Sequence, residues 1–300
     1  MDNTRNERDV IRRLADWAER QPAVRAMLLT RSRANPHACV DALSDYDIVL
    51  VVEDIHSFYE DRTWLSDFGQ VLVAYWDPIF CSPEYGLEQT GNVTQYADGI
   101  EIDFSLWPVE LLRQIALATV LPAALDTGYR VLVDKDHLTG SMPAPTYTAY
   151  VPSPPTAETY QSVVNDLFSD VPYVAKCLWR SELLPAKWCL DEDMKHEFLL
   201  RMLEWRMECD HGWSVPAGHL GRGLQQRLPA EIWSQLEHTY VGAGIADNWE
   251  ALFRTIALFR QVAIEVAARL GHEYPMDLDE RVTAHTQRVR GLGHRAARLE

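Results

Sequence analysis

The spacing of the apolar residues changes near the middle of the chain, and this change narrows the possible folds more than any other feature. Before the change, apolar residues form short runs or alternate with polar ones, as they do in β-strands. After it they recur every third or fourth residue over long segments, which is typical of helices. Pro152, Pro154 and Pro155 mark the linker between the two patterns. The sequence therefore predicts an α+β protein with a strand-rich domain at residues 1–151 and a helical domain at residues 152–300.

The first half of the chain predicts one helix followed by a set of strands. Residues 7–20 place apolar side chains at helical spacing among charged ones. Residues 46–53 form a nearly continuous apolar run, so this strand would be covered on both faces at the centre of a sheet. The pair Asp98-Gly99 predicts a tight turn between two strands within residues 92–108. Further strands are expected at residues 24–30, 68–76 and 128–136, the last of them at an edge.

The second half of the chain predicts helices. Thr156 precedes the first of them and is expected to cap it, and Asp247 is expected to cap the last. Pro172 falls inside the first segment, where it should bend or break the helix because it removes a backbone donor. The helical segments are residues 156–184, 185–209, 229–240 and 247–271.

The charge balance limits the partners of the protein. Its 28 lysines and arginines stand against 44 aspartates and glutamates, which gives a net charge of -16. Such a field repels phosphate backbones and anionic lipids and attracts cations. We therefore expect no nucleic-acid partner and no membrane partner, and the charge favours a small cationic substrate.

The cysteines and the N-terminal residues point to a cytoplasmic protein. The five cysteines are odd in number and contain no C-x-x-C pair, so we expect reduced thiols rather than a disulfide or a zinc site. The first residues are charged where a secretory signal would be apolar. No apolar run approaches the roughly 18 residues that a membrane helix needs.

The segment S-D-Y-D at residues 44–47 is the strongest candidate for a functional site. Asp45 and Asp47 lie two residues apart where a loop enters the central strand, so both carboxylates project from one face. Mg²⁺ prefers such hard oxygen ligands and is usually held by one or two carboxylates plus substrate phosphates. Asp103 lies on the polar face of a later strand that could run alongside, and it would be the third member of the site. Such a trio suits nucleotidyl transfer.

Several separated segments resemble those of a known family. The order of a first strand, an S-R loop, S-D-Y-D and a later I-D-F-S strand is similar to the nucleotidyltransferase superfamily typified by DNA polymerase beta. More narrowly, the chain resembles the aminoglycoside 6-adenylyltransferase (streptomycin adenylyltransferase) family from about residue 8 to about residue 270. The segments that carry the resemblance are LLTRSRANP, LSDYDIVLVVED, GIEIDFSLWP, YRVLVDKD, YVAK, LLRMLEW and NWEALFRTIALFR.

The resemblance implies a polymerase-beta-like nucleotidyltransferase domain with a mixed sheet, followed by a helical bundle that binds substrate. It implies that ATP, with Mg²⁺, adenylates a hydroxyl of a cationic aminoglycoside, most simply streptomycin at the 6 position, which releases pyrophosphate and gives antibiotic resistance. Asp45, Asp47 and Asp103 would be metal ligands, and Asp103 would also be the general base. We expect a monomer. Two alternatives stay open, namely transfer to another small-molecule or protein hydroxyl, and a weakly active or non-catalytic nucleotide-binding homologue.

One position departs from the family pattern. The family has Gly-Ser after the first strand, whereas this chain has Arg31-Ser32. Glycine there lets backbone N–H groups approach the triphosphate and permits a positive φ. Arg31 could block that approach, or it could itself clamp a phosphate, since a guanidinium suits bidentate contact with phosphate oxygens. Ser32 and Arg33 match the family and are expected to contact the β- and γ-phosphates.

The helical domain offers further candidates. Lys176 is expected to reach the triphosphate across a cleft between the domains, and Lys187 is a second candidate of the same kind. A drug that carries guanidinium groups would bind carboxylates and aromatic faces. The alternative for each of these residues is a place in the core or on a solvated surface. The candidates for drug binding are Trp188, Asp191, Glu204 and Trp205.

Overall fold

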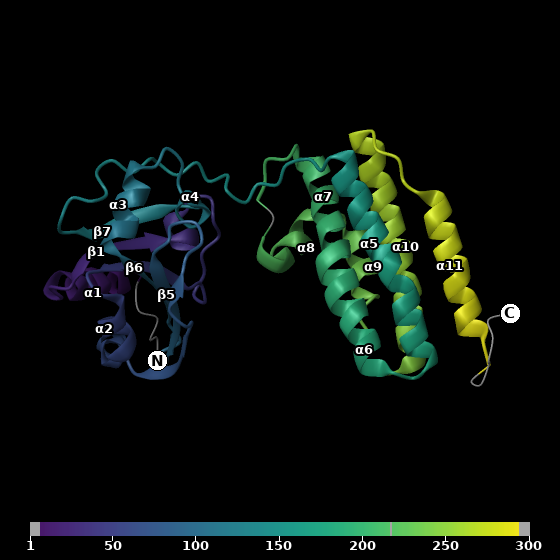
Figure 1. The fold of residues 1–300 in the computed structure, drawn as a ribbon, viewed down its shortest axis with the longest axis horizontal. Helices are drawn as coiled ribbons and strands as arrows, with labels where there is room; N and C mark the ends of the chain where they lie inside the picture. Colours follow the sequence, from purple (N-terminus) through teal and green to yellow (C-terminus); the bar gives the residue numbers. More distant parts are fainter. Residues whose placement is uncertain (1–6, 217, 294–300) are drawn as a thin grey trace. The chain divides into compact units, whose positions relative to one another are not determined.

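The change in apolar spacing corresponds to a change from sheet to helices in the structure. The computed structural model describes residues 7–216 and 218–293, and the chain divides into two units, Met1–Tyr150 and Val151–Glu300 (Figure 1). The first unit is a sheet covered by helices, and the second is a helical bundle. The predicted α+β class is therefore confirmed.

From residue 7 onward, the first unit is built around a seven-stranded sheet. The strand order is β3-β5-β6-β2-β1-β7, and β4 pairs with β5. β2 and β6 run parallel, whereas the other paired strands are antiparallel, so the sheet is mixed. The strands are β1 (Val24–Thr30), β2 (Tyr46–Val52), β3 (Val71–Trp76), β4 (Phe80–Cys81), β5 (Glu88–Tyr96), β6 (Glu101–Pro108) and β7 (Tyr129–Asp134).

β2 lies inside the sheet, and every one of its residues is buried, as its apolar run predicts. Successive side chains of a strand point to opposite faces, so β2 serves two cores. On one face Ile48 packs in a cluster with α1 (Glu7–Arg20). On the other face Val49 packs in a cluster with α3 (Val109–Leu117). The unit also contains α2 (Ile55–Glu60), α4 (Ala123–Asp126) and short 3₁₀ segments at Arg31–Ala34 and Thr63–Phe68.

The predicted hairpin and edge strand are both present. β5 and β6 are antiparallel neighbours joined by the turn at Asp98-Gly99. The N–H of Gly99 donates to the carbonyl of Tyr96 at 3.0 Å, and Gly99 has a φ of 87°, which glycine adopts without strain. β7 pairs with β1 at the end of the strand order.

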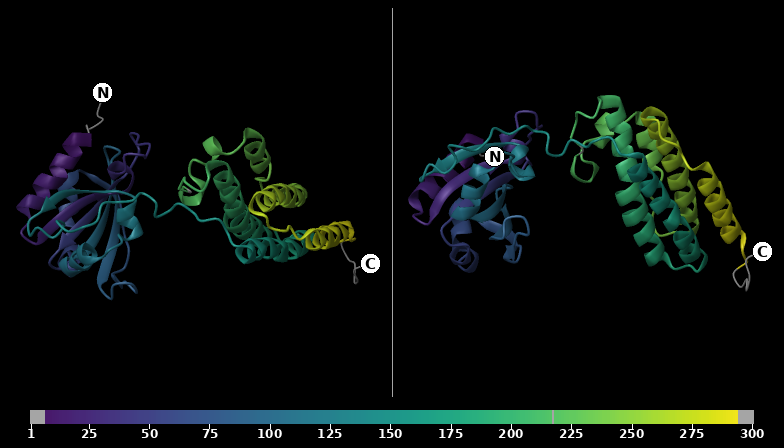
Figure 2. Two further views of the ribbon diagram at one scale, coloured as in Figure 1. Left: turned by 90° about the horizontal axis from the view of Figure 1, so that it is seen from above. Right: turned by 45° about the horizontal axis from the view of Figure 1, so that its top comes forward.

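The second unit is a bundle in which α5, α7 and α10 run side by side (Figure 2). Among its described residues, the core is one apolar cluster drawn from these helices and the segment between α6 and α7. No helix among the described residues is long and apolar enough to cross a membrane. The helices are α5 (Ala157–Trp179), α6 (Leu183–Trp188), a π-helical segment at Cys189–Leu199, α7 (Leu200–His211), α8 (Leu224–Arg227), α9 (Ala230–Glu237), α10 (Ile245–Leu270) and α11 (Met276–Gly291).

The structure confirms the cap at Thr156, contradicts a helix break at Pro172 and contradicts the cap at Asp247. Thr156 caps α5, because its side chain accepts a hydrogen bond from the N–H of Thr159 at 3.1 Å. Pro172 does not end α5, which continues to Trp179 because Val171 before the proline and Val174 after it are buried in the bundle core. Asp247 is not the cap of α10.

The reason for the earlier start of α10 is a pair of side-chain hydrogen bonds. The amide nitrogen of Asn248 donates to the carbonyls of Gly242 and Gly244 at 2.9 and 2.8 Å. These contacts fix the chain ahead of Asp247, so the helix begins at Ile245 with Gly244 as its cap.

Candidate active site

The register of the sheet places Asp47 beside Asp103. β2 and β6 are parallel, and the two aspartates are direct cross-strand partners. Because side chains alternate along a strand, both carboxylates project on the same face as Val49 and Val51, which is the face covered by α3. The sequence analysis expected the strand of Asp103 to run alongside the strand of Asp47, and β6 does pair with β2.

Two further carboxylates lie at the same end of these strands. Asp45 stands two residues before Asp47, and Glu101 stands two residues before Asp103. Carboxylate oxygens of Asp45, Glu101 and Asp103 lie within 4.8 Å of one another. We call Asp45, Asp47, Glu101 and Asp103 the carboxylate cluster.

Glu101 is the member that the sequence analysis missed. The sequence contains a pattern that indicates Glu101. The segment I-E-I-D repeats the spacing of D-Y-D, with two acidic residues on one face of a strand. A search for paired carboxylates on both strands, rather than for a single third partner, would have found it.

The cluster is electrostatically strained in a way that a cation would relieve. Burial, followed by the negative charges of Asp47, Glu101 and Asp45, raises the pKa of Asp103 to about 7. Burial and the charge of Asp45 also raise the pKa of Glu101. The Oδ1 atom of Asp103 is buried and has no hydrogen-bond partner among the described residues. Closely spaced carboxylate oxygens are the donor set that Mg²⁺ prefers, so these residues fit a divalent cation.

Arg31 contributes a positive charge to the cluster. Its Nη1 atom lies 3.2 Å from Oδ1 of Asp47, and its side chain is 61% exposed. Its backbone has a φ of 54°, in the left-handed region that favours glycine. The N–H of Arg31 donates to the carbonyl of Gly128 at 3.1 Å. The chain thus keeps the backbone shape that the family glycine permits, although an arginine occupies the position.

Arg33 holds the loop that carries Asp45. Its Nε atom donates to the carbonyl of Asp45 at 3.0 Å, and Nη2 donates to the carbonyl of Ser44 at 2.6 Å. Its guanidinium also stacks on the ring of Tyr46, 3.9 Å from the centroid. Only 6% of the Arg33 side chain is exposed, so we assign it a positioning role rather than phosphate contact. Ser32 is half-buried on the same turn as Arg31.

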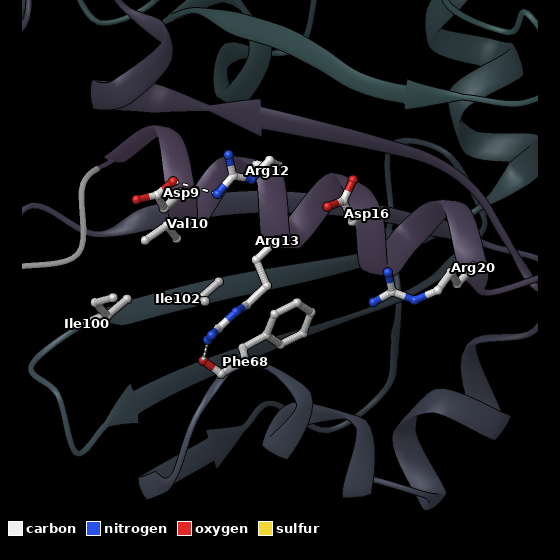
Figure 3. Close-up of a pocket in the computed structure, with 9 residues that line it drawn as sticks. All are labelled: Asp9, Val10, Arg12, Arg13, Asp16, Arg20, Phe68, Ile100 and Ile102. Atoms are coloured by element: carbon white, nitrogen blue, oxygen red, sulfur yellow. Dashed lines mark hydrogen bonds and ion pairs between the residues drawn. The ribbon is translucent and has the colours of Figure 1, made fainter.

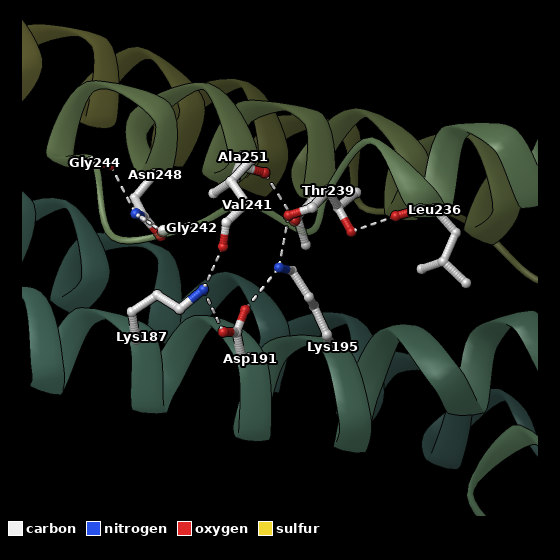
Figure 4. A network of polar contacts seen from close by, with 11 residues as sticks. Lys187, Asp191, Lys195, Leu236, Thr239, Val241, Gly242, Gly244, Asn248 and Ala251 are labelled. Atoms are coloured by element: carbon white, nitrogen blue, oxygen red, sulfur yellow. Dashed lines mark hydrogen bonds and ion pairs between the residues drawn. The ribbon is translucent and has the colours of Figure 1, made fainter.

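In the helical unit, Lys187 and Asp191 belong to an internal network (Figure 4). The Nζ atom of Lys187 lies 2.7 Å from one oxygen of Asp191, and Nζ of Lys195 lies 2.7 Å from the other. Lys187 also donates to the carbonyl of Val241 at 3.0 Å, and Lys195 donates to the carbonyl of Thr239 at 2.7 Å. Asp191 is thus neutralised by two lysines, which leaves no excess negative charge there for a cationic drug.

The other predicted residues of the helical unit lie in different environments. Lys176 is exposed on α5, with its Nζ atom 4.8 Å from the ring centroid of Tyr173. Trp188 is 67% exposed, whereas Trp205 lies in the bundle core with 6% exposed. Glu204 is half-buried, and burial raises its pKa. Trp188 and Glu204 can therefore face a ligand, and Trp205 cannot offer its ring to one.

A hollow of about 290 Å³ beside α1 is separate from the carboxylate cluster (Figure 3). Arg12, Arg13 and Phe68 line it together with Ile102. Ile102 precedes Asp103 on β6, so its side chain points to the opposite face of the sheet. Arg13 closes one side by donating to the carbonyl of Phe68 at 2.7 Å. The hollow belongs to the α1 face and does not open onto the cluster.

Comparison with known proteins identifies relatives over most of the chain. The profile of the streptomycin adenylyltransferase family matches residues 4–289. The chain is 30% identical over 287 residues to the aminoglycoside 6-adenylyltransferase of Bacillus subtilis (strain 168), a match that covers 95% of this chain and 98% of that protein. It is 29% identical over 287 residues to the protein of the same name from Campylobacter jejuni. That match covers 95% of this chain and 96% of the relative. A crystal structure of an aminoglycoside 6-adenyltransferase from Bacillus subtilis matches 95% of this chain and 99% of its own at 26% identity, with a TM-score of 0.44.

Proposed function

The chain belongs to the streptomycin adenylyltransferase family and is a nucleotidyltransferase, and from this premise we propose that it transfers AMP from ATP to a hydroxyl of a cationic aminoglycoside. The acceptor is streptomycin at its 6 position, the second product is pyrophosphate, and the consequence is antibiotic resistance. The observation that carries the proposal is the carboxylate cluster at the aligned ends of two parallel strands. The curated relatives are named for the same activity.

Asp45, Asp47 and Asp103, joined by Glu101, would hold Mg²⁺. When bound, this ion supplies positive charge to the triphosphate and lowers the pKa of the attacking hydroxyl. Arg33 keeps Asp45 in place by binding its carbonyl. The paired strands fix Asp47 and Asp103 at adjacent positions, so neither carboxylate needs to move far for the reaction.

Asp103 is the proposed general base. A carboxylate oxygen of Asp103 accepts the proton of the substrate hydroxyl, and the Oδ1 atom has no hydrogen-bond partner among the described residues. The hydroxyl oxygen forms a bond to the α-phosphorus of ATP, the bond from that phosphorus to the bridging oxygen of the β-phosphate breaks, and pyrophosphate leaves. Removal of the proton by Asp103 makes the oxygen a better nucleophile as the new bond forms.

The remaining predicted residues are proposed as binding groups. Ser32 and the exposed guanidinium of Arg31 are proposed to bind triphosphate oxygens, and exposed Lys176 is proposed for the same anion. Trp188 and Glu204 are proposed for the drug, through an aromatic face and a carboxylate. The net charge of -16 raises the local concentration of a polycationic substrate.

The test is pyrophosphate release from ATP and Mg²⁺ with streptomycin, spectinomycin, kanamycin or no drug. We expect streptomycin-dependent release in the wild type and its loss in Asp47→Asn. The matched control is Asp16→Asn, which makes the same chemical change at an exposed position of α1 and should leave release unchanged.

Two outcomes would contradict the proposal. Pyrophosphate release that depends on a different drug would show that this drug, and not streptomycin, is the acceptor. ATP binding without release for any acceptor would favour the non-catalytic alternative, in which Arg31 blocks the cluster.

A further inference from the structure

Arg31 already places a positive charge on a carboxylate of the proposed metal site. We propose that Arg31 is a tethered cation that competes with the divalent metal for Asp47, so that metal binding requires this guanidinium to leave. The inference rests on the proposed function, because it takes the carboxylate cluster as the metal site. It assigns to Arg31 a role at the metal in addition to phosphate contact.

The first support is the position of the charge. The guanidinium lies 3.2 Å from Oδ1 of Asp47, and only 12% of the Asp47 side chain is exposed. A metal ion bound to the same carboxylate would be repelled by a guanidinium at this distance, so the two cations compete for Asp47. Arg33, on the same turn, contacts the backbone carbonyl of Asp45 and leaves the carboxylate of that residue available.

The second support is the way the backbone presents the side chain. Arg31 holds a φ of 54°, a conformation that a non-glycine residue keeps only where its surroundings fix it. Its N–H is bound to the carbonyl of Gly128, and the preceding Thr30 donates its hydroxyl to the carbonyl of Asp47 at 3.3 Å. The chain is therefore tied to both neighbouring segments, and the side chain starts from a fixed point beside Asp47.

The third support is the exposure of the guanidinium. Because 61% of the Arg31 side chain is exposed, it can leave Asp47 toward solvent without breaking apolar packing. A divalent ion brings twice the charge and contacts more than one carboxylate, so it displaces the guanidinium. A half-exposed ion pair is a weak competitor, so removing it should tighten metal binding by about threefold to tenfold rather than by orders of magnitude.

The experiment measures Mn²⁺ binding to the full chain without nucleotide, by the electron paramagnetic resonance signal of free Mn²⁺, with displacement by Mg²⁺. The variants are Arg31→Gly, Arg31→Gln and Asp47→Asn, and the control is Arg12→Gln. Arg12 also pairs with an aspartate, at 2.7 Å and 70% exposed, so its loss changes the net charge equally at a distant pair. We expect both Arg31 variants to bind Mn²⁺ about threefold to tenfold tighter than wild type, and the control to bind as wild type does. The difference should narrow as salt screens the ion pair.

The outcomes separate the inference from the proposed function. Wild-type affinity in both Arg31 variants, with binding that Asp47→Asn weakens, would overturn the competition while leaving the metal site intact. Equal tightening in Arg12→Gln would also overturn it, since the effect would then come from net charge. Absence of Mn²⁺ binding in every protein would overturn the metal site and the inference together. Arg31→Gln keeps a long side chain at this position, so the test does not depend on Arg31→Gly alone.

Discussion

At the scale of single residues, the sequence predicted the positions that a strand period reveals and missed those that depend on three-dimensional contacts. Asp45, Asp47 and Asp103 were found because acidic residues interrupt apolar strands at fixed spacing, and the structure brings them together. The pairing of Arg31 with Asp47 could not be predicted, because it depends on where a turn aims a flexible side chain. For the same reason Arg33 was expected on phosphate, whereas its donors reach backbone carbonyls and the carboxylate of Glu7.

The strain at Arg31 gives a prediction about stability. In Arg31→Gly and Arg31→Gln the same charge is lost, but only glycine adopts a φ of 54° freely. We expect Arg31→Gly to be more stable than Arg31→Gln by about 1 kcal/mol. Urea unfolding of the two variants measures this difference, which does not include the lost ion pair. Equal stability of the two would show that the surroundings carry no strain at this position.

At the scale of elements, strand and helix positions followed from apolar period, while element ends were set by particular contacts. The start of α10 moved because Asn248 binds two glycine carbonyls, and α5 passed Pro172 because its buried face outweighs one lost hydrogen bond. The network of Asp191 with Lys187 and Lys195 joins the π-helical segment to the chain ahead of α10. The helix predicted over residues 185–209 already places Lys187 and Lys195 four residues from Asp191, but the burial of Lys195 and its contact with the carbonyl of Thr239 depend on the tertiary fold.

That network predicts a structural role for Asp191. In Asp191→Asn, Lys195, with 2% of its surface exposed, loses its neutralising partner and must either stay charged without a carboxylate or give up its proton. We expect the free energy of unfolding to fall by about 3 to 5 kcal/mol, as for other broken buried pairs. Glu204→Gln is the comparison, because it should raise the KM for the drug with little change in stability. If Asp191→Asn has the stability of the wild type and a raised KM for the drug, Asp191 binds the drug and the structural role is wrong.

The contact between α10 and α11 predicts a dependence of stability on pH. Burial alone would raise the pKa of Asp279, but hydrogen bonds from Arg260, Tyr274 and Thr283 outweigh it and hold that pKa below its usual value of 3.8. A lowered folded-state pKa stabilises the protein above the unfolded-state pKa, and this contribution is lost as the pH falls through the folded-state pKa. Asp279→Asn should therefore cost about 2 to 3 kcal/mol at neutral pH, less than for a fully buried pair because 34% of the Arg260 side chain is exposed. Urea unfolding from pH 7 to pH 3 should show the wild type approaching the variant only at the acid end, and a constant gap would contradict this assignment.

At the scale of the whole molecule, the net charge of -16 predicts opposite effects of salt on the two substrates. A polycationic drug is attracted by this field, so its kcat/KM should fall as salt shortens the range of the attraction, by about threefold to tenfold between about 20 mM and about 300 mM KCl. ATP with Mg²⁺ is an anion that the same field repels, so its kcat/KM should stay constant or rise over the same range. The measurement varies each substrate in turn with the other saturating, which makes ATP the control for any general loss of activity in salt. A parallel fall for both substrates would mean that salt acts on the enzyme itself, and a flat response for the drug would mean that local groups such as Glu204 and Trp188, rather than the net charge, determine its capture.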